Sequence, residues 1–180
     1  MNHLKKFLIN IVLILIIFVI YFLQSNFFNW FTIAGVMPNL FVIFILFVGL
    51  FANKMMGTIY GMVLGLFLDV LFREKIGVSF IALGLVGFIA TIFDKNFSKD
   101  SRMTIMLMVA GLTFLYETIV YFANGIINSI NIEILSFARI LIIEIIFNLF
   151  ITIIIYPLIQ KFGYYMENEL KGNKILTRYF

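Results

Sequence analysis

The strongest constraint on the fold is the recurrence of long apolar runs, nearly free of charge, along the whole chain. The first runs from Phe7 to Leu23 without a charged residue and follows Lys5 and Lys6. Because a helix that crosses a bilayer needs about 20 mostly apolar residues, such a run is typical of a transmembrane helix. No small-residue cleavage site follows it, so we interpret it as a retained helix and not as a signal peptide. With 63% hydrophobic and 12% charged residues, the chain is a membrane protein and not a soluble domain.

Polar stretches divide the chain into six predicted helices of an all-α, polytopic membrane protein. The clearest separators are Asp94 to Arg102 and the polar turn Asn124 to Asn131. Pro38 opens the second segment, since proline is tolerated in a first helical turn. The aromatic stretch Phe27 to Val36 is expected in the membrane interface. Pro157 is expected to kink or end the last helix. The predicted helices span about 7–23, 38–52, 56–72, 76–93, 103–122 and 134–159, in one membrane domain that ends in a cytoplasmic tail, 161–180.

Basic residues are distributed unevenly between the predicted loops. With alternating topology, only Arg73 and Lys75 fall on one side, and ten basic residues fall on the other. The positive-inside rule places the ten in the cytoplasm, and both termini with them. The positive net charge is therefore interpreted as a topology signal and not as evidence for a nucleic-acid partner. The ten residues are Lys5, Lys6, Lys54, Lys95, Lys99, Arg102, Lys161, Lys171, Lys174 and Arg178.

The third predicted helix carries glycines at four-residue spacing. Gly57, Gly61 and Gly65 fall on one slowly drifting face, and Asp69 continues it. In lipid, small residues at this spacing let another helix backbone approach closely. One interpretation is ordinary packing inside the bundle. The other is docking of a partner's membrane helix, which we favour because the three glycines form a groove about 12 Å long.

Four ionisable residues lie within the predicted spans: Asp69, Glu117, Arg139 and Glu144. At about 1.5 Å per residue, the three carboxylates lie roughly 22 Å or more from the cytoplasmic edge, with Arg139 higher still. Because a charge inside a membrane needs a partner or a task, we predict an intramembrane polar cluster in which Arg139 pairs with at least one carboxylate. This cluster is either an outward-facing cavity or partner site, or a structural network that fixes helix packing. Two sets of polar companions share a helix face and are expected to point inward: Thr113, Glu117 and Tyr121; and Glu144, Asn148, Thr152 and Tyr156.

The sequence offers few residues that could bind a metal or catalyse a reaction. The chain has no cysteine and a single histidine, His3, which leaves no ligand set for a transition metal. No nucleophile, metalloprotease or phosphate-loop pattern is present. We therefore predict a protein that is not an enzyme and that needs no cofactor or metal.

A combination of short motifs resembles the MreD family of rod-shape-determining proteins. It consists of Pro38-Asn39-Leu40, then Gly61, Gly65 and Asp69 at four-residue spacing, and finally Gly77. The resemblance covers most of the chain, and its length and helix number agree with the family. The charged turn Phe72-Arg73-Glu74-Lys75 departs from the small residues and proline that many members have after the aspartate.

The resemblance implies a non-enzymatic integral membrane scaffold of the bacterial cell-elongation complex, which controls cell shape and peptidoglycan synthesis. The implied partners are an MreC-like single-span protein, an MreB-like cytoplasmic actin homologue and the peptidoglycan synthases of the complex, all at the cell membrane. The family also resembles, in helix number and size, the S components of energy-coupling-factor transporters. The alternative function is therefore a small-molecule-binding subunit of a vitamin transporter, and gene neighbourhood would discriminate between the two.

Overall fold

The computed structural model describes residues 3–52, 55–72, 77–96, 99–129 and 133–171. Over these residues the chain is helical, without a β-strand, which confirms the predicted all-α class. The predicted charged turn at Arg73 and the end of the predicted tail, 172–180, lie outside the described residues. The helices are α1 (His3–Phe22), the π-helical turn η1 (Leu23–Phe27), α2 (Phe28–Trp30), α3 (Leu40–Phe51), α4 (Met56–Phe72), α5 (Val78–Asn96), α6 (Arg102–Asn128) and α7 (Ile134–Lys171).

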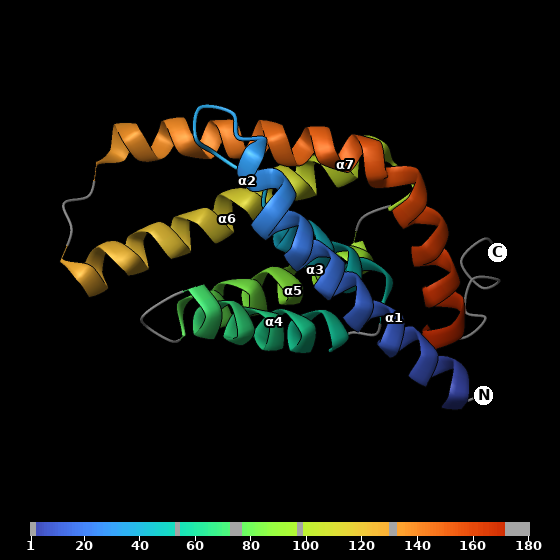
Figure 1. The fold of residues 1–180 in the computed structure, drawn as a ribbon. Helices are drawn as coiled ribbons and strands as arrows, with labels where there is room; N and C mark the ends of the chain where they lie inside the picture. Colours follow the sequence, from blue (N-terminus) through green and yellow to red (C-terminus); the bar gives the residue numbers. More distant parts are fainter. Residues whose placement is uncertain (1–2, 53–54, 73–76, 97–98, 130–132, 172–180) are drawn as a thin grey trace.

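α3 lies at the centre of the molecule, with other helices on every side (Figure 1). All of its residues are buried, from Leu40 to Phe51. A helix that is apolar on all faces needs protein or lipid on all faces, and here α4, α5, α6 and α7 supply the protein. Its 12 residues give a length of about 18 Å, which is shorter than the roughly 30 Å of a bilayer core. α3 is therefore a short core helix of the bundle, and the expectation that it crosses the membrane stays a prediction.

Within the described residues, three helices are long and apolar enough to cross a membrane. They are the α1–α2 run Leu4–Trp30, α6, and α7 over Ile134–Leu170. α3, α4 and α5 are apolar but shorter. The sequence thus identified the apolar segments, but it did not separate the long helices from the short ones packed among them.

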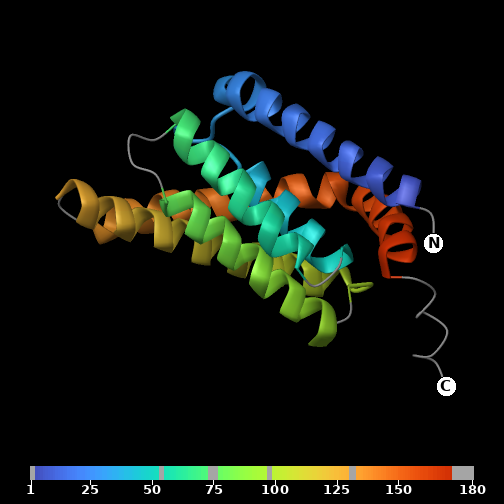
Figure 2. The same ribbon diagram turned by 90° about the horizontal axis from the view of Figure 1, so that it is seen from below.

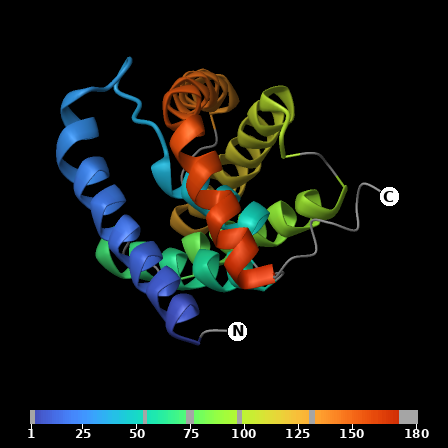
Figure 3. The same ribbon diagram turned by 90° about the vertical axis from the view of Figure 1, so that its right-hand side faces the viewer.

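The last two helices are longer than predicted. α6 continues to Asn128, so most of the predicted turn Asn124 to Asn131 is helical; the helix ends at Ser129, whose φ of 52° is left-handed. α7 continues through Pro157 to Lys171, so the predicted tail begins as helix. The helix changes direction sharply between its orange and red parts (Figures 1 and 3). Pro157 lies inside this helix and does not end it, and a proline inside a helix is a usual cause of a kink.

The glycine stripe of α4 packs against α5, which runs beside it (Figure 2). A Cβ atom added at Gly61 would lie within 3.0 Å of the Leu83 carbonyl group, and one added at Gly65 would lie as close to Ser79 backbone atoms. At Gly57 the near neighbour is the Cα of Gly49 in α3. The space beside all three glycines is therefore occupied by backbone atoms of the same chain. This corrects the expectation of a free docking stripe, and the first interpretation, internal packing, describes what the glycines do.

α1 lies at the edge of the bundle (Figure 2). Along its length only Ile9 and Leu13 are buried, and most of its other apolar side chains are exposed. Side-chain contacts hold it to α4, with the Tyr60 hydroxyl donating to Asn10 Oδ1 at 2.9 Å and Tyr21 packed edge-on against Phe67. α1 consequently presents a long apolar surface to its surroundings.

The start of α1 and the end of α7 lie at the same end of the molecule (Figure 1). Lys5 Nζ and Glu169 Oε1 are 2.7 Å apart there. At this end Lys99, from the segment between α5 and α6, bonds Asp94 Oδ1 at 2.7 Å and Glu167 Oε1 at 2.6 Å. Two basic residues that the topology prediction assigned to one side, Lys5 and Lys99, thus both bond carboxylates near the end of α7.

Candidate functional site

The site is built around the segment that leads into α3. Asn39 is the N-cap residue of α3, and its side-chain oxygen accepts from the Val42 amide at 3.3 Å. Such a cap satisfies one of the free N–H groups in the first turn. From η1, Gln24 Nε2 donates to the Pro38 carbonyl at 2.6 Å, and Gln24 Oε1 accepts from the Leu40 amide at 3.3 Å. One glutamine therefore holds both sides of the Pro38-Asn39-Leu40 motif.

Asn39 also connects α3 to the two long helices. Its backbone amide donates to Asn148 Oδ1 of α7 at 2.7 Å, and its side-chain Nδ2 donates to Glu117 Oε1 of α6 at 3.4 Å. Asn148 Nδ2 donates in turn to Thr113 Oγ1 at 3.0 Å, and Thr152 bonds the Asn148 carbonyl. Thr113, Asn148 and Thr152 are fully buried. Buried polar groups of this kind are normally all hydrogen-bonded, and here they join α6 and α7 at the start of α3.

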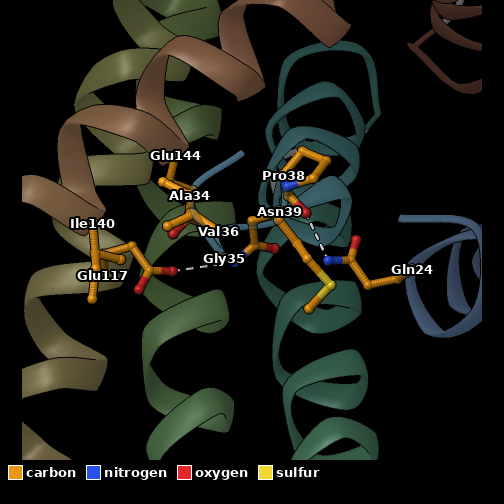
Figure 4. A pocket seen from close by; sticks show the side chains of 10 residues that line it. Gln24, Ala34, Gly35, Val36, Pro38, Asn39, Glu117, Ile140 and Glu144 are labelled. Atoms are coloured by element: carbon orange, nitrogen blue, oxygen red, sulfur yellow. Dashed lines mark hydrogen bonds between the residues drawn. The ribbon is translucent and has the colours of Figure 1, made fainter. Parts of the chain in front are cut away.

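A cavity of about 350 Å³ opens beside this network (Figure 4). We call it the carboxyl cavity, because Glu117 of α6 and Glu144 of α7 line it together with Gln24 and Asn39. Glu144 is only 6% exposed. Its carboxyl group interacts with the carboxyl group of Glu117 and with the side chain of Asn39. The residues that line the carboxyl cavity are Gln24, Ala34, Gly35, Val36, Met37, Pro38, Asn39, Glu117, Ile140 and Glu144.

A tight turn forms one wall of the carboxyl cavity. Ile33 and Val36 bond each other through both backbone pairs, at 3.0 and 2.9 Å. Between them Ala34 and Gly35 have φ values of 51° and 80°, the left-handed pair that a two-residue type I′ turn requires. The predicted interfacial stretch therefore ends in a closed turn over the cavity.

A second cavity of about 420 Å³ meets the first at Gln24, Met37 and Asn39, which line both. We call it the hydroxyl cavity, because Ser25 and Ser79 line it. Its remaining walls are Asn29, Phe41, Leu68 and Tyr116. The side chain of Ser79 also interacts with the carboxyl group of Asp69.

Asp69 has a different task from the other carboxylates. It is fully buried and accepts from the backbone amides of Gly77 at 2.8 Å, Ser79 at 3.0 Å and Phe80 at 3.1 Å. A carboxylate at this place satisfies the free N–H groups of the first turn of α5 and complements the positive end of its dipole. Gly77 has a φ of 122°, which favours glycine. The family motif from Gly61 to Gly77 therefore builds the α4–α5 hairpin.

The predicted four-residue polar cluster is thus divided in three. Glu117 and Glu144 share a cavity, Asp69 caps α5, and Arg139 lies exposed on α7. Arg139 makes no ion pair with any of these three carboxylates, all of which the structure describes. This corrects the predicted pairing. The physical reason is that Arg139 lies on a different face of α7 from Glu144, so a common location in the outer half of the membrane did not bring the side chains together.

Two further functional positions were not singled out from the sequence. Gln24 could have been singled out, since it is the polar residue that directly follows the uncharged apolar run Phe7 to Leu23. Lys99 could not have been singled out, because its partners come from three different helices. It bonds Asp94 of α5 and Glu167 of α7, and its Nζ lies 5.1 Å from the ring centroid of Phe51 in α3. Only the bend of α7 brings Glu167 to it.

Chemically, the site is suited to binding and to fixing helices. Its functional groups are carboxyls, carboxamides and hydroxyls, which accept or donate hydrogen bonds. Among the described residues, no group of three or more His, Cys, Asp or Glu is placed to hold a metal ion.

Comparison with known proteins agrees with this architecture. The model of the family described as rod shape-determining protein MreD matches residues 5–164. That range includes Gln24, Asn39, the α4–α5 hairpin and both carboxylates of the cavity. No curated protein and no solved structure matches the chain, so the likeness to transporter S components stays a prediction. On a match that covers nearly its whole length, this chain belongs to the MreD family of rod shape-determining proteins.

Proposed function

We propose that this protein is a non-enzymatic membrane scaffold of the machinery that elongates the bacterial cell and directs peptidoglycan synthesis. The family match over residues 5–164 carries the proposal. The site supports it, because the hydrogen bonds of Asn39 join α3 to α6 and α7, which is a structural role.

The partners we propose are an MreC-like single-span protein, an MreB-like actin homologue in the cytoplasm and the peptidoglycan synthases of the complex. The membrane helix of the single-span partner would pack on an apolar surface of the bundle. α1 offers such a surface, since only Ile9 and Leu13 of its length are buried. In lipid, helices associate through packing and interhelical hydrogen bonds and not through a hydrophobic force.

We propose a multi-pass topology in the bacterial cell membrane with both termini in the cytoplasm. The common position of the start of α1 and the end of α7 supports this (Figure 1). The concentration of basic residues near this end supports the same orientation.

Depletion of the protein in its own host tests the function. We expect depleted cells to lose their elongated shape and become round, and a plasmid copy of the wild-type gene to restore the shape. Cells that keep a normal length and width after full depletion would refute the proposal.

One observation favours a second candidate, a small-molecule-binding subunit of a transporter. It is the pair of cavities beside Asn39, whose volumes are about 350 and 420 Å³. A subunit of this kind requires an energising ATPase. Genes for transport ATPases beside this gene, in place of cell-shape genes, would favour the transporter.

A further inference from the structure

The bundle presents apolar surfaces of two different lengths. α4 has 17 residues, and the apolar part of α5, Val78–Asp94, is equally short, so each spans about 25 Å. α6 has 27 residues, and the part of α7 from Ile134 to Tyr156 is nearly as long, which gives about 33 to 40 Å for this pair. The hydrocarbon core of a bilayer is roughly 30 Å thick. The α4–α5 pair is therefore too short for it, and the α6–α7 pair is long enough.

The difference in length falls at one end of the molecule. At the opposite end the Tyr156 hydroxyl of α7 donates to the Asp100 carbonyl at 3.3 Å, and Lys99 Nζ bonds Asp94 Oδ1 of α5 at 2.7 Å. These contacts hold α5, α6 and α7 together there. From this end α6 and α7 extend past the far ends of α4 and α5 (Figures 1 and 2). The proposed topology makes the far end the outer side of the membrane.

The short pair has a surface suited to lipid along its whole length. Among the side chains that the structure describes, all the exposed ones on α4 and α5 are apolar. In the sequence Lys54 precedes α4 and Arg73 follows it. Because charged groups are costly in hydrocarbon, the apolar surface cannot be extended past these residues. The residues from α4 and α5 that contribute most to this surface are Ile59, Val63, Leu66, Val70, Ile81 and Phe88.

Polar groups occupy the outer part of the bundle next to the short pair. At the start of α3, Gln24, Asn39 and Glu117 line the carboxyl cavity. The hydroxyl cavity reaches the outer ends of the short pair, since Leu68 of α4 and Ser79 of α5 line it. Irregular backbone at membrane depth is tolerated only where it is buried in protein or lines a water-filled cavity. This part of the bundle therefore suits water and lipid headgroups better than acyl chains.

We propose that the bilayer is locally thinned beside α4 and α5, because its outer leaflet is drawn inward to the ends of these helices. Beside α6 and α7 the bilayer keeps its full thickness, so the partner of the short surface is a thin patch of lipid. A short apolar segment can also be accommodated by snorkelling of flanking side chains or by oligomerisation. Thinning is favoured because α3, α4 and α5 all end short of the long pair, and polar cavities lie where their continuation would be. This thinning rests on the multi-pass topology proposed for the chain and goes beyond its role as a scaffold.

The test measures the depth of spin labels on the full chain in nanodiscs. The native sequence has no cysteine, so Val70→Cys on α4 and Ile142→Cys on α7 each give one labelled site. These positions are 63% and 57% exposed, and both lie about 21 Å along their helix from its cytoplasmic side, at Met56 and Tyr156. Power saturation with oxygen, which concentrates in hydrocarbon, and with a water-soluble nickel chelate gives the depth. The lipids are dimyristoleoyl, dioleoyl and dierucoyl phosphatidylcholine, which form thin, intermediate and thick bilayers.

We expect the Val70→Cys label to stay close to the headgroups in all three lipids, since the bilayer adjusts to the end of α4. The Ile142→Cys label is expected to lie deeper as the acyl chains lengthen. In dioleoyl lipid the two depths should differ by about 5 Å, which is the difference between a bilayer core of roughly 30 Å and a short pair of about 25 Å. Ile81→Cys, at 56% exposure on α5, gives the same reading if Val70→Cys does not fold.

Val63→Cys is the matched reference, because Val63 is on the same face of α4 as Val70 and is equally exposed. Its label should lie in hydrocarbon in every lipid. The thinning is refuted, with the topology intact, if the Val70→Cys label deepens in parallel with the Ile142→Cys label. It is refuted equally if the Val70→Cys label is shielded from both reagents, which would show protein at this surface. A Val63→Cys label exposed to the nickel chelate would instead overturn the topology, and the thinning with it.

Discussion

Substitution of Gly61 by alanine tests the packing of α4 on α5 most sharply. The added Cβ would lie within 3.0 Å of the carbonyl carbon and oxygen of Leu83. Those atoms are backbone and cannot rotate away, so the two helices must separate. Overpacking of this kind costs about 1 to 3 kcal/mol, and the fixed obstacle places Gly61→Ala toward the upper end.

Gly111→Ala is the matched control. Gly111 is also within a helix, α6, but nothing lies within 4 Å of a Cβ built there. Both variants gain the same helix propensity, about 0.8 to 1 kcal/mol for glycine to alanine. That gain cancels in the difference between them, which leaves the overpacking cost of about 1 to 3 kcal/mol.

The assay is loss of helical circular dichroism as SDS is titrated into mixed micelles of the purified protein. We expect Gly61→Ala to unfold at a lower SDS fraction than the wild type, and Gly111→Ala to unfold at an equal or higher one. If the two variants unfold at the same SDS fraction, α5 does not occupy the glycine stripe, and the stripe would again be open to a partner.

Three other predictions follow from single contacts. Asp69→Asn is expected to destabilise the protein by about 1 to 3 kcal/mol, because it removes the charge that accepts from the first turn of α5; faster hydrogen exchange confined to that turn would identify the cause, and unchanged exchange would contradict it. Lys99→Met is expected to increase proteolysis of the end of α7, since the carboxylates it joins lose their shared cation, whereas Lys161→Met, on an exposed side chain, leaves it unchanged. A cysteine at Asn128 should react with an impermeant thiol reagent in intact cells and one at Asn168 should not, and the reverse pattern would overturn the orientation.

The helical class and most segment boundaries could be predicted because they depend on local composition. α4 begins and ends where the apolar run does, at Met56 and Phe72. The burial of Asn148 and Thr152 also followed from helical spacing, since a polar stripe in an apolar helix must face protein. These are statements about one helix at a time.

What could not be predicted depends on which helices are neighbours. Four-residue glycine spacing shows that a backbone approaches α4, but it does not show that the backbone is α5 and not a partner. We predicted that Asp69 and Arg139 lie close together because both fall in the outer half of the membrane, but depth says nothing about rotation around the helix axis or position in the membrane plane. Pro157 predicted a kink in α7, but the sequence did not show that the C-terminal part of this helix places Glu167 beside Lys99.

Affinity purification of the tagged protein from native membranes, in mild detergent and after brief in-cell cross-linking, tests the central claim most directly. If the protein is a scaffold of the elongation machinery, a single-span MreC-like protein is recovered in a stoichiometric amount, together with the actin homologue and the peptidoglycan synthases. Recovery of transport ATPases in their place, with none of the cell-shape proteins, would contradict the account.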